Sequence, residues 1–115
     1  MPIYRISEEF ILRALDSIKA QTMTEYTVYV CDGTPPEHQI YDAQAVVECY
    51  GFNYLRQDPT RKLVGGARNQ AVADGSNPFI AFLDGDDQWY DSYLAELKTE
   101  IESSTDKTAI WASVL

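Results

Sequence analysis

The strongest constraint on the fold is an unbroken apolar run, FIAFL at residues 79–83, which leads directly into Asp84. An apolar run without polar alternation is typical of a β-strand covered on both faces, as in parallel sheets flanked by helices. Along the rest of the chain, strand-like runs alternate with helix-like runs. This alternation predicts an α/β fold with Rossmann-like α/β/α layers and a mostly parallel sheet.

The predicted elements follow from residue spacing and from helix-capping residues. Ser7 is the expected N-cap of the first helix, and Thr34 with Glu37 forms a capping box for the second. Apolar residues at helical spacing predict helices over residues 7–21, 34–50, 63–74 and 90–103. Runs rich in β-branched and aromatic residues predict strands over residues 27–31, 52–56, 79–83 and 109–114.

The size and charge of the chain exclude several classes of function. We expect its 115 residues to form a single domain. A formal net charge of -9 argues against a nucleic-acid partner and against unaided binding to an anionic membrane. The sequence shows no signal peptide and no long apolar run, so we expect a cytoplasmic protein without direct membrane insertion. Cys31 and Cys49 lack CxxC spacing, which favours reduced structural thiols over a disulfide or metal pair.

The acidic cluster Asp84-Gly85-Asp86-Asp87 follows the apolar run. Ligands of parallel α/β sheets bind outside the carboxyl ends of the strands, where this cluster is expected to lie. Its carboxylates repel one another unless a cation neutralises them, and Mg²⁺ or Mn²⁺ takes one or two carboxylates together with water and phosphate oxygens. Asp-Gly is also common turn chemistry, so a simple strand-ending turn is the alternative. The cluster alone leaves both interpretations open.

Asp32 follows the strand predicted over residues 27–31, so it is expected at the same edge of the sheet as the acidic cluster. With Thr34 as the helix cap, Asp32 is predicted to be free to accept hydrogen bonds from a base or ribose. The alternative is an ordinary loop.

The glycine pair Gly65-Gly66 lowers helix stability, which indicates a close backbone approach. The nearby Arg68 could pair with Asp84 or Asp86, or contact phosphate. The alternative is tight helix–sheet packing beside ordinary surface cations. His38, the only histidine, is expected to have no catalytic role.

Taken together, these pieces resemble the nucleotide-binding half of family 2 glycosyltransferases with the GT-A fold. FILRALDSIKAQT at residues 10–22 is similar to the first helix of that family and the turn after it. VCDGT at residues 30–34 resembles its VDDGS element, with Cys31 in place of the first Asp. GARNQA at residues 66–71 resembles its ARNxG segment, and FIAFLDGDDQW at residues 79–89 resembles its LDSDD strand end, the DxD motif.

The resemblance implies a role for each matching residue. Asp32 would bind the base, Asp84 would contact the ribose or the metal, and Asp86 would coordinate a Mg²⁺ or Mn²⁺ ion that bridges the diphosphate. Tyr4 would lie near the base, because residues 2–5 resemble the end of the family's PxYN loop, and Arg68 would orient the carboxylates or the phosphates. The implied reaction is transfer of a sugar from a nucleotide-diphosphate sugar, with a UDP-sugar expected first, to an acceptor hydroxyl.

This chain departs from the family pattern in two ways. Only Met1 precedes Pro2, where the family has an apolar strand that is central in the sheet. The acceptor-binding half, which carries the family's catalytic base, lies outside residues 1–115, so no catalytic residue is assigned. The chain is therefore expected to be a truncated GT-A domain. The alternative is a non-catalytic assembly module, whose unpaired strand edges would pair in a homo-oligomer or with a strand-donating partner.

Overall fold

The computed structural model describes residues 1–105, and its centre is a three-stranded parallel sheet. The strands β1 (Pro2–Ile3), β2 (Tyr29–Asp32) and β3 (Asn53–Arg56) lie in the order β1-β2-β3. Pro2 pairs with Cys31, and Tyr29 pairs with Asn53. Because both pairs are parallel, the carboxyl ends of all these strands lie at one edge of the sheet.

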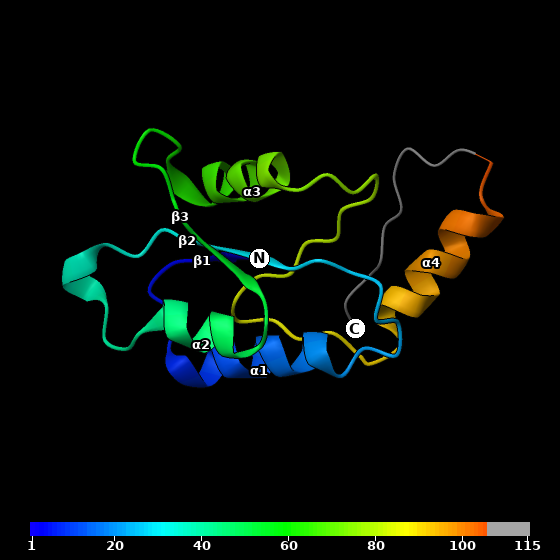
Figure 1. The fold of residues 1–115 in the computed structure, drawn as a ribbon, viewed down its shortest axis with the longest axis horizontal. Coiled ribbons are helices and arrows are strands. Elements are labelled where there is room, and N and C mark those ends of the chain that lie inside the picture. The colour runs from blue at the N-terminus through cyan, green and yellow to red at the C-terminus, as the bar shows by residue number, and fades with distance from the viewer. Residues whose placement is uncertain (106–115) are drawn as a thin grey trace.

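Helices cover both faces of this sheet (Figure 1). The helices α1 (Glu8–Lys19) and α2 (Ala43–Cys49) lie on one side, and α3 (Leu63–Asp74) lies on the other. The helix α4 (Tyr93–Ser103) lies beyond one end of the sheet, and a short 3-10 helix, η1 (Pro36–His38), precedes α2. This arrangement confirms the predicted α/β/α layers. None of the helices within residues 1–105 is long and apolar enough to cross a membrane.

Helix α1 forms where its sequence pattern predicts it. The side chain of Ser7 accepts a hydrogen bond from the backbone N–H of Phe10 at 3.3 Å, and acidic residues occupy the first turn. Its apolar stripe packs under the sheet, and full burial of each large apolar side chain stabilises the fold by about 1.5–3 kcal/mol. The core that results contains Ile3, Ile11, Ala14, Leu15, Ile18, Val30, Ala43, Val47, Phe52 and Leu83.

The region after β2 differs from the predicted single helix over residues 34–50. Thr34 caps no helix: its hydroxyl oxygen accepts from the backbone N–H of Arg5 at 2.8 Å. The chain forms η1 instead, and α2 begins later, where the Asp42 carboxylate accepts from Ala45 N–H at 3.0 Å. Prolines at positions 35 and 36 suit a short turn, and Asp42 offers a stronger cap nearer the apolar stripe. The predicted end at Gly51 is confirmed by its φ of 77°.

The prediction of a strand over residues 79–83 is wrong. The segment has no strand partner within residues 1–105, and the side chains of Phe79, Ile80 and Phe82 are 46%, 55% and 52% exposed. Only Leu83 is buried. A strand needs a neighbour to pair its backbone groups, and no described strand adjoins this segment. Within the described residues, β1 is the edge strand next to β2.

An apolar groove of about 620 Å³ separates the segment 79–83 from β2. It is lined on one side by Val28 and Tyr29, on the other by the segment 79–83, and at its end by Met1. The amine of Met1 donates to the Tyr29 carbonyl at 2.8 Å. Sequence analysis predicts no strand before residue 27, yet Pro2–Ile3 form a short one beside β2.

The remaining predictions differ from the structure only in detail. The helix over residues 63–74 and its end at Gly75 are confirmed, whereas α4 begins at Tyr93 instead of residue 90. The predicted strand over residues 109–114 lies outside the described residues. Both cysteines are free thiols; Cys31 is buried, as expected of a structural thiol, whereas Cys49 is exposed. Burial raises the pKa of the Cys31 thiol.

The glycine pair at the start of α3 makes a testable contrast. A Cβ added at Gly66 would overlap the Arg61 carbonyl group, whose carbon lies 2.5 Å away, whereas a Cβ at Gly65 would meet nothing within 4 Å. We expect Gly66→Ala to lower the free energy of unfolding by about 1–3 kcal/mol, because rigid backbone must shift. Gly65→Ala should raise it by up to about 1 kcal/mol through helix propensity. Urea denaturation measures both, and equal stabilities would contradict the close approach at Gly66.

Candidate functional site

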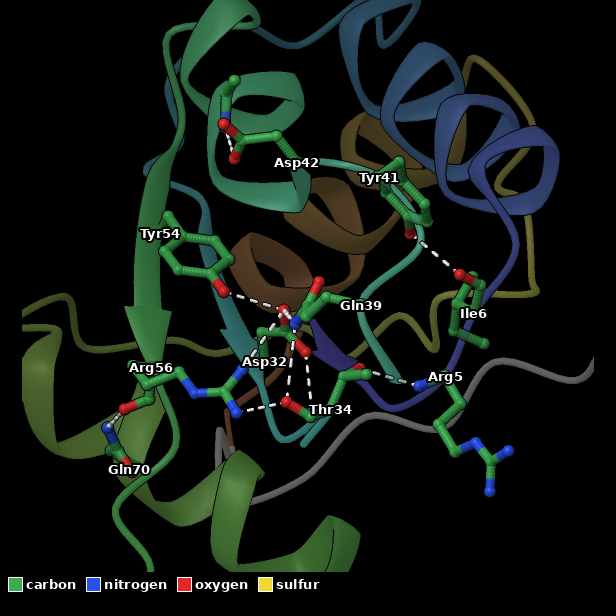
Figure 2. Close-up of polar contacts among 11 residues, drawn as sticks. Arg5, Ile6, Asp32, Thr34, Gln39, Tyr41, Asp42, Tyr54, Arg56 and Gln70 are labelled. Carbon is green, nitrogen blue, oxygen red and sulfur yellow. Dashed lines mark hydrogen bonds and ion pairs between the residues drawn. The ribbon is translucent and has the colours of Figure 1, made fainter. Parts of the chain in front are cut away.

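The carboxylate of Asp32, the last residue of β2, is enclosed by hydrogen-bond donors (Figure 2). Its side chain is only 1% exposed. The Oδ1 atom accepts from the backbone N–H of Thr34 at 2.8 Å. The Oδ2 atom accepts from the hydroxyl of Tyr54 at 2.7 Å and from Nε2 of Gln39 at 3.0 Å. The prediction that Thr34 caps a helix and leaves Asp32 open to the crevice is therefore wrong.

Strand β3 supplies two of the groups around Asp32. Nη1 of Arg56 lies 3.7 Å from Oδ2, and Nη2 donates to the Thr34 carbonyl. Burial, followed by the hydrogen bond to Asp32, raises the pKa of Tyr54 to about 12. Tyr54 and Arg56 are two positions apart, so both side chains leave the same face of the strand. Gln70 of α3 donates to the Arg56 carbonyl at 2.8 Å and fixes the end of this strand.

The acidic cluster forms a turn at the same edge of the sheet. The backbone N–H of Asp87 donates to the Asp84 carbonyl at 3.0 Å, so the strand-ending turn is present. Gly85 in this turn packs against Ile3: a Cβ on Gly85 would lie 2.8 Å from the Ile3 Cγ2 atom. Ile3 is in turn paired with Asp32. Ile3 therefore contacts both acidic motifs: it pairs with Asp32 in the sheet and packs against Gly85 in the turn.

Arg68 of α3 reaches the acidic turn. Its Nη2 atom lies 2.6 Å from Oδ1 of Asp84 in an ion pair that is partly exposed. The predicted pairing of Arg68 with Asp84 is thus confirmed. Its guanidinium carbon also lies 5.9 Å from the centre of the Phe82 ring, which holds the side chain along the turn. Arg68 therefore joins α3 to Asp84, the residue for which the family resemblance implies contact with the ribose or the metal.

The other predicted ligand residues are exposed at this edge. Tyr4 is 58% exposed and lies beside Gly33, because a Cβ on Gly33 would be 3.7 Å from the Tyr4 ring. The side chain of Asp86 is exposed and makes no hydrogen bond or ion pair within residues 1–105. No group of three or more His, Cys, Asp or Glu side chains within those residues is arranged to hold a metal ion. Any metal site here depends on fewer protein ligands.

Sequence analysis missed the donors to Asp32. Tyr54 and Arg56 occupy alternate positions in a predicted strand, so their side chains lie on the same face. This spacing indicates two polar groups that can meet the Asp32 carboxylate together. Gln39 lies between η1 and α2, where no periodic pattern places its side chain. Arg5 was missed as well: it adopts a left-handed φ of 52° and ties the loop after β1 to Thr34.

Comparison with known proteins gives a consistent family signal. A family model described as glycosyl transferase family 2 matches residues 1–112. The succinoglycan biosynthesis protein ExoW of Rhizobium meliloti (strain 1021) is 31% identical over 119 residues, which cover 99% of this chain and 36% of that protein. The UDP-Glc:alpha-D-GlcNAc-diphosphoundecaprenol beta-1,3-glucosyltransferase WfgD of Escherichia coli is 33% identical over 90 residues, which cover 77% of this chain and 34% of that protein.

A solved structure shares the fold. The crystal structure of S. aureus TarS superposes with a TM-score of 0.73 at 24% identity, over 88% of this chain and 18% of that chain. This likeness confirms the predicted GT-A type of α/β fold. The chain spans about a third of the length of the curated relatives it matches, at 36% and 34%.

Removing the Tyr54 hydroxyl should test the enclosure of Asp32. We expect Tyr54→Phe to lower the free energy of unfolding by about 1.5–3 kcal/mol, because a buried carboxylate loses a charged hydrogen bond. The tyrosine pKa of about 12 lies above its ordinary value of 10.0, so the unfolded chain loses the proton first. Stability should therefore fall as pH rises from 10 to 12, and less steeply in the variant.

Tyr50→Phe is the matched control for the loss of stability at neutral pH. It is no control at alkaline pH, because the pKa of Tyr50 is also raised to about 12. The Tyr50 hydroxyl donates to Asp16 at 2.5 Å on the exposed surface, so its loss should cost about 0.5 kcal/mol. Chemical denaturation at neutral pH compares the two variants, and the series from pH 10 to 12 compares Tyr54→Phe with the wild-type chain. Equal losses for Tyr54→Phe and Tyr50→Phe would show that the Asp32 enclosure adds no stability.

Proposed function

Because the chain belongs to glycosyl transferase family 2, we propose that the edge bearing Asp32 and Asp84 binds a nucleotide-diphosphate sugar with a divalent metal ion. The bound sugar would be transferred to an acceptor hydroxyl. The observation that carries this proposal is that Ile3 contacts both acidic motifs, through its pairing with Asp32 and its packing against Gly85. Carboxylates from the end of β2 and from the acidic turn then lie at the carboxyl edge of the sheet, where one extended ligand would reach both.

The nucleoside end of the ligand fits the Asp32 side of this edge. The exposed ring of Tyr4 lies next to Gly33 and offers a flat surface for a base. Asp32 is a pure acceptor when ionised and suits a base that presents an N–H group. The full name of WfgD includes UDP-Glc, which supports UDP as the first nucleotide to test.

The diphosphate end fits the acidic turn. Mg²⁺ and Mn²⁺ are typically held by one or two carboxylates plus phosphate oxygens, so Asp86 and Asp84 are sufficient protein ligands. Asp86 is exposed and has no competing partner within the described chain, and it is the better ligand. Arg68 uses one of its five N–H donors on Asp84 and keeps others for phosphate. A metal ion bound here would stabilise the departing diphosphate as a Lewis acid.

We assign neither the acceptor site nor the general base to residues 1–105. Transfer to a hydroxyl needs a base within hydrogen-bond reach of the proton it removes. The chain spans 36% and 34% of its curated relatives, so the activity of the whole protein goes beyond the donor site. For residues 1–105 we therefore propose binding of the nucleotide-diphosphate sugar that donates the sugar.

Metal-dependent nucleotide binding tests this proposal directly. We expect UDP to bind in the presence of Mn²⁺, and Asp86→Ala to weaken that binding by about 10-fold or more, a loss of about 1.4 kcal/mol. Isothermal titration calorimetry with and without a chelator gives both numbers. Asp91→Ala is the matched control, because Asp91 is an exposed aspartate just beyond the turn. Binding that ignores both the chelator and Asp86→Ala would refute the metal site.

A second candidate function is assembly, and the apolar groove favours it. The strand-like segment 79–83 exposes Phe79, Ile80 and Phe82, and it makes no backbone–backbone hydrogen bond within residues 1–105. Open backbone groups beside apolar side chains form a template for pairing with another chain. We propose a second copy of this chain as the partner in this alternative, with the groove as the shared interface.

Charge placed in the groove should separate the two candidates. Under the assembly alternative, Ile80→Lys abolishes self-association, because a charge at a 55% exposed groove position opposes apolar contact. Ile40→Lys is the control, since Ile40 is 84% exposed and lies outside the groove. Sedimentation velocity over a concentration series measures the mass. A wild-type chain that stays monomeric throughout excludes assembly through this groove and leaves donor binding unaffected.

A further inference from the structure

The Asp32 carboxylate has no acceptor capacity left on Oδ2. That atom accepts from Tyr54 at 2.7 Å and from Gln39 at 3.0 Å, with Nη1 of Arg56 at 3.7 Å. A carboxylate oxygen offers about two lone-pair sites, so the two hydrogen bonds fill it. The side chain is also only 1% exposed. A ligand that uses Oδ2 must therefore replace one of these donors.

Gln39 is the donor that can leave. The Thr34 N–H belongs to the turn that directly follows β2, and Tyr54 lies within β3, paired with Val30. Gln39 lies outside every helix and strand, between η1 and α2. Its side chain is drawn between Asp32 and the loop that leads to Tyr41 (Figure 2). Releasing Gln39 breaks no backbone pairing of the sheet.

The loop 36–42 comprises η1 and the residues after it, and it is held to the rest of the chain mainly by side-chain hydrogen bonds. Nε2 of Gln39 contacts Asp32 and, at 3.4 Å, the Thr34 carbonyl. The hydroxyl of Tyr41 donates to the Ile6 carbonyl at 2.9 Å. Ile40 is 84% exposed, so its side chain does not anchor the loop in the core. Between this loop and the residues around Asp32 lies a pocket of about 260 Å³.

The Gln39 carboxamide has the same donor chemistry as a nucleobase imide. It presents an N–H next to a carbonyl, as does the imide edge of uracil. We propose that Gln39 holds the base position on Asp32, and that a base with such an edge binds by displacing it as the loop 36–42 opens. This inference rests on the proposed function and assigns to Gln39 a gating role at its nucleoside end.

The expected change in ligand affinity follows from the replacement of the Gln39 N–H by an N–H of the base. One N–H···O⁻ bond replaces another, so the apparent affinity is lowered mainly by the fraction of molecules in which the loop is closed. Gln39→Ala removes the competing donor and should tighten binding of uridine by about 3- to 10-fold. Gln39→Met keeps the bulk but not the N–H, and should tighten binding as well if the hydrogen bond is the gate.

Uridine is the ligand for this test, because it carries neither diphosphate nor metal and reports on the base site alone. Titrations followed by NMR compare the wild-type chain, Gln39→Ala, Gln39→Met and the control Gln44→Ala. Gln44 donates to Glu48 at 2.9 Å on the exposed surface of α2 and should leave uridine affinity unchanged. In the wild-type chain, bound uridine should also shift the side-chain amide resonances of Gln39 away from those of the closed loop.

The outcomes separate this inference from the function on which it rests. Weaker uridine binding by Gln39→Ala would overturn the inference, because Gln39 would then contact the base. Unchanged affinity, or no uridine binding by any variant, would overturn it too. In each of these cases Mn²⁺-dependent UDP binding that is lost in Asp86→Ala would still uphold the proposed donor site. If UDP binding did not depend on the metal, but Gln39→Ala bound uridine more tightly, the displacement of Gln39 would be supported and the proposed metal site would not.

Discussion

The buried Asp32 carboxylate organises this fold. An unpaired charge in the interior is costly, so a fully buried carboxylate requires donors on every accessible side. Those donors come from three parts of the chain: the turn at Thr34, strand β3 through Tyr54, and the loop at Gln39. Each segment is held where it can satisfy the same side chain. The end of β2, the strand β3 and the end of η1 are thereby fixed relative to one another.

The acidic turn depends on this arrangement through Ile3. Ile3 pairs with Asp32 in the sheet and packs against Gly85 in the turn, so a shift of β1 would move both acidic motifs together. Arg68 adds a second connection, from α3 to Asp84 at 2.6 Å. The geometry of the candidate site is therefore set by a short strand and one partly exposed ion pair. Exposed ion pairs contribute little stability, so Arg68 orients Asp84 more than it stabilises the fold.

Local signals predicted the elements whose partners are nearby in sequence. Ser7 and the apolar stripe of α1, and the boundaries of α3, follow from capping and helical spacing within the segment itself. Residues 79–83 carry an equally strong strand pattern, yet they form no strand among the described residues, because pairing depends on a neighbour that composition does not supply. The site divides in the same way. Asp32, Asp84 and Arg68 follow from motif positions, but Gln39 approaches Asp32 through a loop without periodicity.

The enclosure of Asp32 reconciles two opposing demands on a ligand-binding carboxylate. Left open to solvent, it would be available to a base but would lose the interactions that join β2 to β3. Enclosed by backbone and strand donors alone, it would be stable but closed to any ligand. A donor on a loop resolves this conflict: Gln39 satisfies the charge while no ligand is bound, and its release leaves Thr34 and Tyr54 in place. Because donor replaces donor, the carboxylate is never left unpaired during the exchange, and the cost of opening falls on the loop instead of the sheet.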